Sequence, residues 1–205
     1  MIAIIDYGVG NLYSISHSLA FLGIESGVTG DPEAVSRAEG LILPGVGAFG
    51  DARKKLAEAG LDRAVTHAAQ NGTPLLGICL GMQLLFDRSY EFGEHQGLGL
   101  IPGEIRPLRP DIPETLKVPH IGWNALSLLR PCPLAKYLSE GDSVYYVHSF
   151  YAKGAGNAVK AVSDYGVPVP GLVQAGNVFG AQFHPEKSGL VGLSVLRAFG
   201  EVVSC

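Results

Sequence analysis

One cysteine stands in a sequence setting that favours nucleophilic chemistry. Cys79 is the centre of Gly77-Ile78-Cys79-Leu80-Gly81, which has the form G-x-C-x-G. In hydrolases with G-x-S-x-G, the nucleophile lies on a sharp turn between a strand and a helix, where only small residues fit two positions away on either side. In such a turn the thiol is exposed at the top of the sheet, and the first N–H groups of the helix favour its thiolate. The pattern predicts a nucleophile, and the alternative is a buried structural thiol.

A histidine that could act as the base for this cysteine lies far downstream. His184 is part of Phe183-His184-Pro185-Glu186, which directly follows a predicted strand. Because a residue before proline takes an extended backbone, we expect His184 to project from the strand end, with Glu186 on the same side to orient its imidazole. Triad members are commonly distant in sequence and adjacent in space. The sequence therefore predicts a triad of Cys79, His184 and Glu186.

Acyl transfer also needs N–H groups aimed at the developing oxyanion. The segment Pro44-Gly45-Val46-Gly47 follows a second predicted strand, so it should lie at the same carboxyl edge of the sheet as the cysteine. We predict that the N–H of Leu80 and that of Val46 or Gly47 form the oxyanion hole. The alternative for this segment is an ordinary tight turn.

Two other kinds of site are disfavoured by residue spacing. His-x-Glu also opens the zinc deaminase signature, but that signature is completed by Pro-Cys-x-x-Cys, and the chain offers only Pro131-Cys132-Pro133, upstream of the histidine. Gly8-Val9-Gly10 follows the first strand like a dinucleotide fingerprint, yet Tyr13 occupies the position of the third glycine. We therefore expect no metal and no cofactor.

Composition narrows the class of protein. A chain of 205 residues suits one domain, residues 1–205, and its charge of −4 leaves no basic field for nucleic acid or an anionic membrane. A signal peptide begins with basic residues, but no Lys or Arg precedes Arg37. No apolar run reaches the roughly 18 residues of a membrane helix. The three cysteines form no disulfide framework, and Cys132 and Cys205 have no catalytic pattern. We expect a cytoplasmic protein that binds neither nucleic acid nor membrane.

Alternating strands and helices are predicted to position these groups. Short apolar runs typical of buried strands alternate with stretches of helical spacing, which implies an α/β fold with a mostly parallel central sheet and helices on both faces. Later runs alternate like hairpin strands and predict a C-terminal antiparallel extension, and residues 93–133 are expected to be extended segments and loops. The expected strands are residues 2–5, 41–44, 74–78, 144–147, 158–162, 171–173 and 178–183, and the expected helices 12–22, 51–59, 61–70, 80–86 and 189–202.

These motifs carry a family resemblance. Gly77-Ile78-Cys79-Leu80-Gly81-Met82-Gln83, together with His184-Pro185-Glu186, resembles the class I glutamine amidotransferases, and the resemblance extends over nearly the whole chain. Within that family, five further stretches resemble the glutaminase subunits of imidazole glycerol phosphate synthases. They are Asp6-Tyr7-Gly8-Val9-Gly10-Asn11-Leu12, Pro44-Gly45-Val46-Gly47-Ala48-Phe49-Gly50, His120-Ile121-Gly122-Trp123-Asn124, Tyr146-Val147-His148-Ser149-Phe150 and Gln182-Phe183-His184-Pro185-Glu186-Lys187-Ser188.

The resemblance implies a glutaminase that works with a partner. Its chain would hydrolyse glutamine and deliver ammonia to a separate cyclase subunit, a (β/α)8 barrel, in a heterodimer of histidine biosynthesis. By resemblance, the substrate is held by Gly47, Gln83, Glu91, Ser149 and Phe150, and the partner interface and its gating involve Asn11, Trp123, Tyr145 and Lys187.

Three other functions remain open from the sequence alone. They are an amidotransferase subunit for another acceptor, a stand-alone cysteine hydrolase of similar fold and an inactive scaffold subunit. The His-Ile-Gly-Trp-Asn stretch and Lys187 argue against the first, and the complete triad argues against the last.

Overall fold

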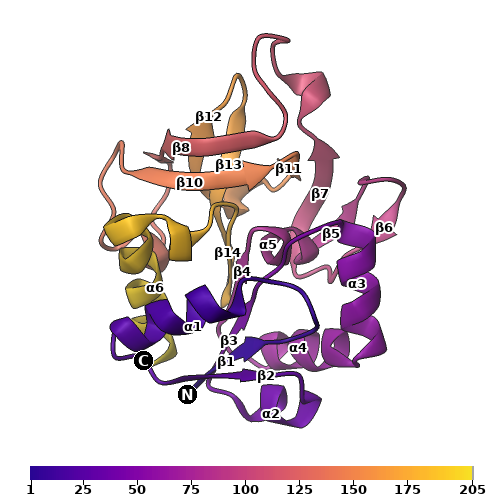
Figure 1. The fold of residues 1–205 in the computed structure, drawn as a ribbon, viewed down its shortest axis with the longest axis vertical. Helices are drawn as coiled ribbons and strands as arrows, with labels where there is room; N and C mark the ends of the chain where they lie inside the picture. The colour runs from indigo at the N-terminus through magenta and orange to yellow at the C-terminus, as the bar shows by residue number, and fades with distance from the viewer. Residues whose placement is uncertain (205) are drawn as a thin grey trace.

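An eight-stranded sheet runs through the centre of the molecule in the order β2-β1-β3-β4-β14-β13-β12-β9 (Figure 1). The computed structural model describes residues 1–204, and Cys205 lies outside the described residues. The pairings from β2 to β14 are parallel, and those from β14 to β9 are antiparallel. The strands are β1 (Ile2–Ile5), β2 (Ser26–Thr29), β3 (Gly40–Leu43), β4 (Leu75–Ile78), β9 (Ser127–Leu128), β12 (Val159–Asp164), β13 (Pro168–Ala175) and β14 (Val178–Ala181).

Helices cover both faces of this sheet. On one side lie α1 (Leu12–Phe21) and α6 (Gly189–Val203), and on the other α2 (Pro32–Arg37), α3 (Phe49–Glu58) and α4 (Leu61–Gln70) (Figure 1). Strand β1 shows why: Ile2 and Ile4 pack into the core under α1 and α6, whereas Ala3 and Ile5 pack under α3 and α4. Because side chains alternate along a strand, a strand buried on both faces is apolar throughout.

Strand β14 joins the parallel and antiparallel parts of the sheet. We expected residues 178–183 to belong to the antiparallel extension, and β14 does pair antiparallel with β13. It also pairs in parallel with β4, the strand that leads to Cys79. This insertion brings the chain before His184 alongside the chain before Cys79.

The helix that follows the cysteine is shorter than predicted. Helix α5 spans Leu80–Leu84, and β5 (Phe86–Ser89) begins where we expected the helix to continue. Phe86 pairs with Ile101 of β7 (Ile101–Pro107), so this tertiary pairing overrides the helical periodicity. Strand β2 and helix α2 were not predicted, although Asp31 caps α2 by accepting a hydrogen bond from the N–H of Glu33.

Two smaller sheets lie beyond the carboxyl edge of the central sheet. One has the order β11-β7-β5-β6 and includes β11 (Phe150–Lys153) and β6 (His95–Gln96). The other contains β8 (His120–Ala125) and β10 (Ser143–His148), which pair only with each other among residues 1–204. We call this two-strand sheet the β8–β10 ribbon. Four short 3-10 turns complete the described structure: Arg109–Asp111, Pro133–Ala135, Gly156–Ala158 and Pro185–Lys187.

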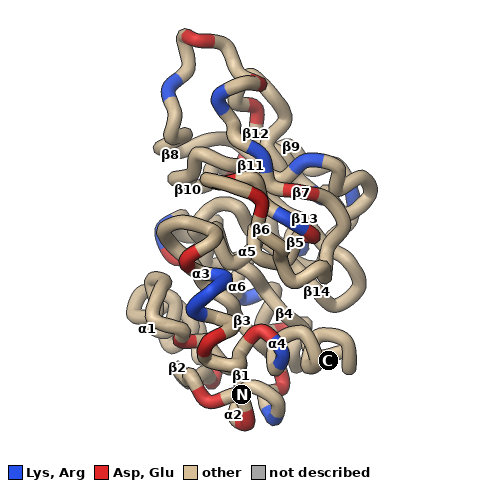
Figure 2. Tube along the Cα trace, turned by 90° about the vertical axis from the view of Figure 1, so that its right-hand side faces the viewer, with Lys and Arg blue, Asp and Glu red and all other residues tan. Residues whose placement is uncertain are grey.

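Charged residues of both signs are scattered over the molecule, as Figure 2 shows for Lys and Arg against Asp and Glu. Within residues 1–204, none of the helices combines the length and the apolar character needed to span a membrane. Nor do the described residues bring together three His, Cys, Asp or Glu side chains that could hold a metal ion.

Candidate active site

Cys79 lies on a strained turn at the junction of β4 and α5. Its φ of 54° and ψ of −111° are rare for a residue with a side chain, and such a conformation costs about 1–3 kcal/mol that the surrounding structure must offset. The N–H of Cys79 donates to the carbonyl of Ala181 at 2.7 Å, which ties the turn to the end of β14. The predicted turn is present. The predicted exposure is wrong, because Cys79 lines a cavity and only 7% of it is exposed.

The two glycines of the motif are required by close backbone contacts. A Cβ atom at Gly81 would overlap the carbonyl oxygen of Leu43, and one at Gly77 would lie 2.7 Å from the carbonyl oxygen of Gly81. Each of these two Cβ contacts would be closer than real Cβ atoms approach other atoms. The chain therefore packs the turn against β3 with no room for a side chain two positions from the cysteine.

His184 and Glu186 form the pair expected from sequence. His184 has an extended backbone, with φ −98° and ψ 99°, before Pro185. Its Nδ1 lies 2.8 Å from Oε1 of Glu186, whose side chain is fully buried. The other ring nitrogen, Nε2, is buried without a hydrogen-bond partner among the described residues. It is therefore free to exchange a proton with a group in the cavity.

The protonated form of His184 is favoured by its neighbours. Burial opposes the charge, but the interactions of the imidazolium with Cys79 and Glu186 outweigh it and raise the pKa of His184 to about 9. Around Cys79, the Sγ atom lies 3.8 Å from the carbonyl oxygen of Val147 and 3.8 Å from Nε2 of Gln182. The thiol of Cys79 can donate to the Val147 carbonyl, and protonated His184 lies beside it in the same cavity.

A cavity of about 330 Å³ opens above the cysteine and the histidine. It is within the range of small-molecule sites. The predicted oxyanion and substrate residues gather around it from separate parts of the chain. Its lining comprises Val46, Gly47, Cys79, Leu80, Gln83, Glu91, Pro119, Val147, His148, Ser149, Phe150 and His184.

Glu91 supplies a carboxylate to the lining of this cavity. Its Oε2 accepts a hydrogen bond of 2.7 Å from the N–H of Phe49, the first residue of α3. Burial raises the pKa of Glu91, and the bond to Phe49 partly reverses that shift. An acidic group at a helix N-terminus is electrostatically favoured. Glu91 is thereby held at the cavity by a helix far from it in sequence.

Gln83 uses its side-chain amide to hold the cavity lining in place. Its Nε2 donates to the carbonyl of Phe150 at 3.0 Å and to Oε1 of Gln182 at 3.0 Å. Both amide hydrogens are therefore used within the protein. Gln182 lies between Gln83 and the thiol of Cys79, a position that sequence reasoning did not single out.

Tyr7 is a second residue that sequence reasoning missed. Its hydroxyl donates to the carbonyl of Pro44 at 2.8 Å, at the start of the predicted oxyanion segment. Burial and the nearby Cys79 raise the pKa of Tyr7, so it stays a neutral donor. The sequence did not indicate this role, because Tyr7 lies in a short loop and its hydrogen-bond partner is 37 residues away.

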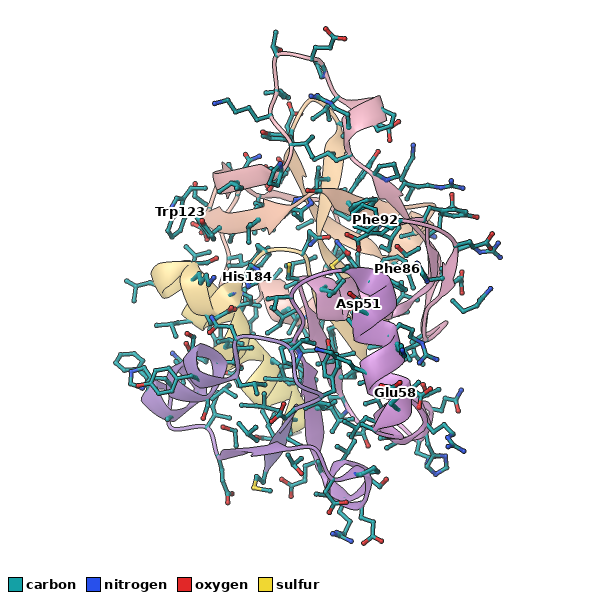
Figure 3. The ribbon with its side chains drawn as sticks, turned by 45° about the vertical axis from the view of Figure 1, so that its right-hand side comes forward. Asp51, Glu58, Phe86, Phe92, Trp123 and His184 are labelled. Carbon is teal, nitrogen blue, oxygen red and sulfur yellow. The ribbon has the colours of Figure 1, made fainter. Side chains whose placement is uncertain are left out.

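The four predicted interface residues lie beside the triad. Asn11 donates to Oε1 of Glu186 at 3.2 Å, and the carbonyl of Tyr145 accepts from the N–H of His184 at 3.0 Å. Trp123 packs edge-on against Tyr145 and is 59% exposed. Figure 3 shows Trp123 at the rim of the molecule and His184 nearer its centre. Lys187 is exposed on the turn that also holds Glu186.

The fold and the site residues together define a class of protein. Residues 3–200 match the family model described as glutamine amidotransferase class-I. The chain therefore belongs to the class I glutamine amidotransferase family.

Relatives within that family are similar along the full chain, and several of them carry the name imidazole glycerol phosphate synthase subunit HisH. The subunit of Listeria monocytogenes is 50% identical over 206 residues, covering 100% of this chain and 98% of the relative. The subunit of Bacillus cereus is 53% identical over 203 residues, covering 99% and 95%. The subunit of Geobacillus kaustophilus is 53% identical over 203 residues, covering 97% and 95%.

Solved structures agree with the predicted fold class. A crystal structure of a glutamine amidotransferase superposes with a TM-score of 0.77 at 21% identity, covering 100% of this chain and 99% of the other. The structure of PurLQS from Thermotoga maritima gives 0.75 at 21% identity, covering 98% and 97%. At such identity the likeness concerns the fold alone, and the α/β architecture is confirmed.

Proposed function

We propose that this chain is the glutaminase subunit of an imidazole glycerol phosphate synthase. It hydrolyses glutamine to glutamate and ammonia, and the ammonia passes to a separate cyclase subunit, a (β/α)8 barrel, in histidine biosynthesis. The observation that carries the proposal is the strained turn of Cys79 in a cavity shared with His184, whose Nδ1 is bonded to Glu186. Full-length similarity to subunits of that name supports the choice of pathway.

The first half of the reaction forms a thioester. The thiolate of Cys79 attacks the side-chain amide carbon of glutamine, and the negative charge that develops on the amide oxygen is stabilised by N–H groups of Leu80 and of Val46 or Gly47. His184, protonated at Nε2, then gives its proton to the departing nitrogen. The C–N bond breaks, ammonia leaves and a glutamyl thioester remains on the sulfur.

The second half regenerates the enzyme. His184, now neutral and held by Glu186, takes a proton from water, and the water oxygen attacks the thioester carbon. The C–S bond breaks as glutamate leaves, and the cysteine and histidine return to their starting state. The sum is one glutamine and one water converted to glutamate and ammonia.

The α-ammonium group of glutamine needs a negatively charged partner, and its α-carboxylate needs N–H donors. We assign the carboxylate of Glu91 to the ammonium group, because it is the acidic side chain in the cavity lining. The backbone of Gly47, Ser149 and Phe150 suits the α-carboxylate, and Gln83 acts on the substrate through the position of Phe150.

Coupling to a partner follows from the product. Free ammonia is protonated and lost in bulk water, so the cavity should open toward a sealed partner surface. We propose that Asn11, Trp123, Tyr145 and Lys187 form part of this surface, and that the two subunits act as a heterodimer in the cytoplasm. Asn11 and Tyr145 contact Glu186 and His184 directly, so a partner that moves them also moves the triad.

Glutamate release tests the proposal. The purified chain is assayed alone, with the cyclase subunit, and with the cyclase plus its ribonucleotide ligand, and Cys79→Ala serves as the blank. We expect strong activation that depends on both additions and is absent in the variant. High activity of the chain alone, unchanged by the cyclase, would indicate a stand-alone hydrolase, and activation by a different acceptor subunit would indicate another pathway.

A further inference from the structure

Two buried histidines, one of which lines the cavity, have no part in the proposed chemistry: His148 is in the cavity lining, and His120 pairs with it. His120 on β8 and His148 on β10 are cross-strand partners in the β8–β10 ribbon, and they are only 2% and 6% exposed. Nδ1 of His120 lies 3.0 Å from Nε2 of His148, and Nδ1 of His148 lies 2.9 Å from the carbonyl oxygen of Phe150.

These contacts determine where the ring protons are. A carbonyl oxygen only accepts, so Nδ1 of His148 carries the hydrogen in its bond to Phe150. In a neutral ring the other nitrogen then accepts, so Nε2 of His148 takes a hydrogen from Nδ1 of His120. Burial, together with the mutual proximity of the rings, keeps both neutral by lowering the pKa of His148 to about 3, and burial lowers that of His120 to about 4.

The histidine pair is one end of a continuous chain of contacts to the nucleophile. The carbonyl of Phe150 accepts from His148 and also from Nε2 of Gln83. Gln83 in turn donates to Gln182, whose Nε2 lies 3.8 Å from Sγ of Cys79. The carbonyl of Phe150 is thus shared. It accepts one hydrogen bond from His148 and another from Gln83, which also bonds to Gln182 beside the thiol.

The ribbon needs such attachments because it is a two-stranded sheet. An isolated pair of strands is marginally stable in water, and β8 and β10 pair with no third strand within residues 1–204. Two residues along β10 from His148, the ribbon is held by the bond between the Tyr146 hydroxyl and Ser163 of β12, at 2.9 Å. His120 also stacks between the rings of Tyr146 and Tyr165, with centroids 4.7 Å and 3.8 Å away.

We propose that His120 and His148 are positioning residues for the substrate pocket: a neutral pair with fixed tautomers that holds the carbonyl of Phe150, and with it residues 147–150 of the cavity wall. The inference rests on the proposed function, since this wall contacts substrate only if glutamine binds in the cavity. It adds a specific role to the hydrogen bonds of His120, beyond the packing of its ring.

Two variants of His120 separate the hydrogen bond from the packing. His120→Asn keeps a donor at the place of Nδ1 and loses the stacked ring, whereas His120→Phe keeps a ring between the tyrosines and loses the donor. In the complex with the cyclase and its ligand, we expect His120→Phe to raise KM for glutamine about tenfold, the effect of one buried hydrogen bond. We expect kcat to change by less than about threefold, and His120→Asn to stay near the wild-type KM.

A third variant tests the other end, and a fourth serves as the control. His148→Gln keeps an acceptor for His120 and removes the donor to Phe150, so we expect it to raise KM as His120→Phe does. His67→Gln changes an exposed histidine on α4, remote from the cavity lining, and should leave KM unchanged. A KM that rises in His120→Asn and not in His120→Phe would overturn the proposal, because ring packing would then be the role of His120.

Nitrogen NMR of the histidine rings tests the pair without any assay of activity. In the chain alone, His148 should give the spectrum of a neutral ring protonated at Nδ1, and His120→Phe should shift the Nε2 signal of His148. An unchanged signal, or His148 protonated at Nε2, would overturn the proposal even if glutaminase activity is present. Absence of glutamate release from the wild-type complex would instead contradict the proposed function, and the NMR result would stand by itself.

Discussion

The cavity has two walls that the protein builds in different ways. The wall with Cys79 is the edge of the central sheet, where β4 is hydrogen-bonded on both sides and Gly77 and Gly81 lie against backbone. The opposite wall belongs to the β8–β10 ribbon. The histidine pair joins its two strands, and side-chain bonds from Tyr146 to Ser163 and from Asn124 to the carbonyl of Asp164 attach it to β12. The first wall is held by main-chain packing, and the second by individual hydrogen bonds.

The histidines on the two walls have opposite charge preferences. His184 has Glu186 and Cys79 as neighbours, and its pKa is raised to about 9. Burial lowers the pKa of His148 to about 3, and its neighbours, the ring of His120 and the carbonyl of Phe150, supply no negative charge to oppose that shift. The comparison teaches that burial alone does not decide the charge of a histidine: the partner does. The rigid wall holds the charged group, and the ribbon holds neutral groups whose hydrogen bonds set its position.

Replacing Gly81 should break the rigid wall. In Gly81→Ala the new Cβ meets the carbonyl oxygen of Leu43, and neither backbone can yield. We expect the free energy of unfolding in urea to fall by about 3 kcal/mol or more, or the chain not to fold. Gly72→Ala is the matched control, since Gly72 has a positive φ but open space around it, and it should cost only about 1 kcal/mol. Equal losses would mean that the contact with the carbonyl of Leu43 is not the cause of the loss at Gly81.

Neutralising Glu186 should remove the charge preference of the rigid wall. Glu186→Gln keeps a hydrogen-bonding side chain but loses the negative charge beside Nδ1 of His184. We expect kcat in the complex to fall by at least about a hundredfold, the range of lost acid–base catalysis. The pKa of His184, followed by NMR, should fall below its value of about 9. A lower rate with an unchanged pKa would contradict this explanation.

Acid should weaken the ribbon before the rigid wall. His120 and His148 have lowered pKa values of about 4 and about 3, so below pH 6.5 the unfolded chain binds protons that the folded chain does not. Stability therefore falls from pH 6.5 toward pH 4, by up to about 1.4 kcal/mol per pH unit for each histidine. Urea unfolding of wild type and His120→Phe measures the difference. The variant should have the shallower slope, and parallel curves would contradict the assigned states.

Base should weaken the rigid wall. The raised pKa of His184 means that the folded chain keeps a proton which the unfolded chain loses above pH 6.5. The contribution of His184 is complete below pH 6.5 and is lost as the pH rises to about 9. Unfolding of wild type and Glu186→Gln between pH 6 and pH 9 tests the sign: the decrease should be smaller in the variant. A larger decrease in Glu186→Gln would reverse the assignment.

The outer face of the ribbon should matter least to the isolated chain. Trp123 is 59% exposed, so Trp123→Ala should change the free energy of unfolding by less than about 0.5 kcal/mol. The affinity of the Trp123→Ala chain for the cyclase, measured by calorimetry, should be at least about tenfold lower than that of the wild type, as for an aromatic residue that becomes buried at an interface. A large loss of stability with normal binding would make Trp123 a structural residue of the ribbon.

Much of the rigid wall was predictable because its causes are local. The turn at Cys79 follows from small residues two positions on either side, and the extended backbone of His184 follows from Pro185. The long helices and most strands of the central sheet followed from apolar spacing. Helix α5 ends early because β5 pairs with β7, and neither β5 nor β11 was predicted. The short elements β2 and α2 were missed because four and six residues carry little periodicity.

The ribbon was less predictable because its causes are distant contacts. The sequence determined that Cys79 would occupy a tight strand-to-helix turn and that His184 and Glu186 would stand together, since steric limits and neighbouring residues act within a few positions. Only the tertiary structure decided that β14 lies beside β4, that Glu91 caps α3, and that His120 bonds to His148. The physical reason is that these contacts join residues 28 to more than 100 positions apart in the chain, where apolar spacing carries no information about which polar groups will meet.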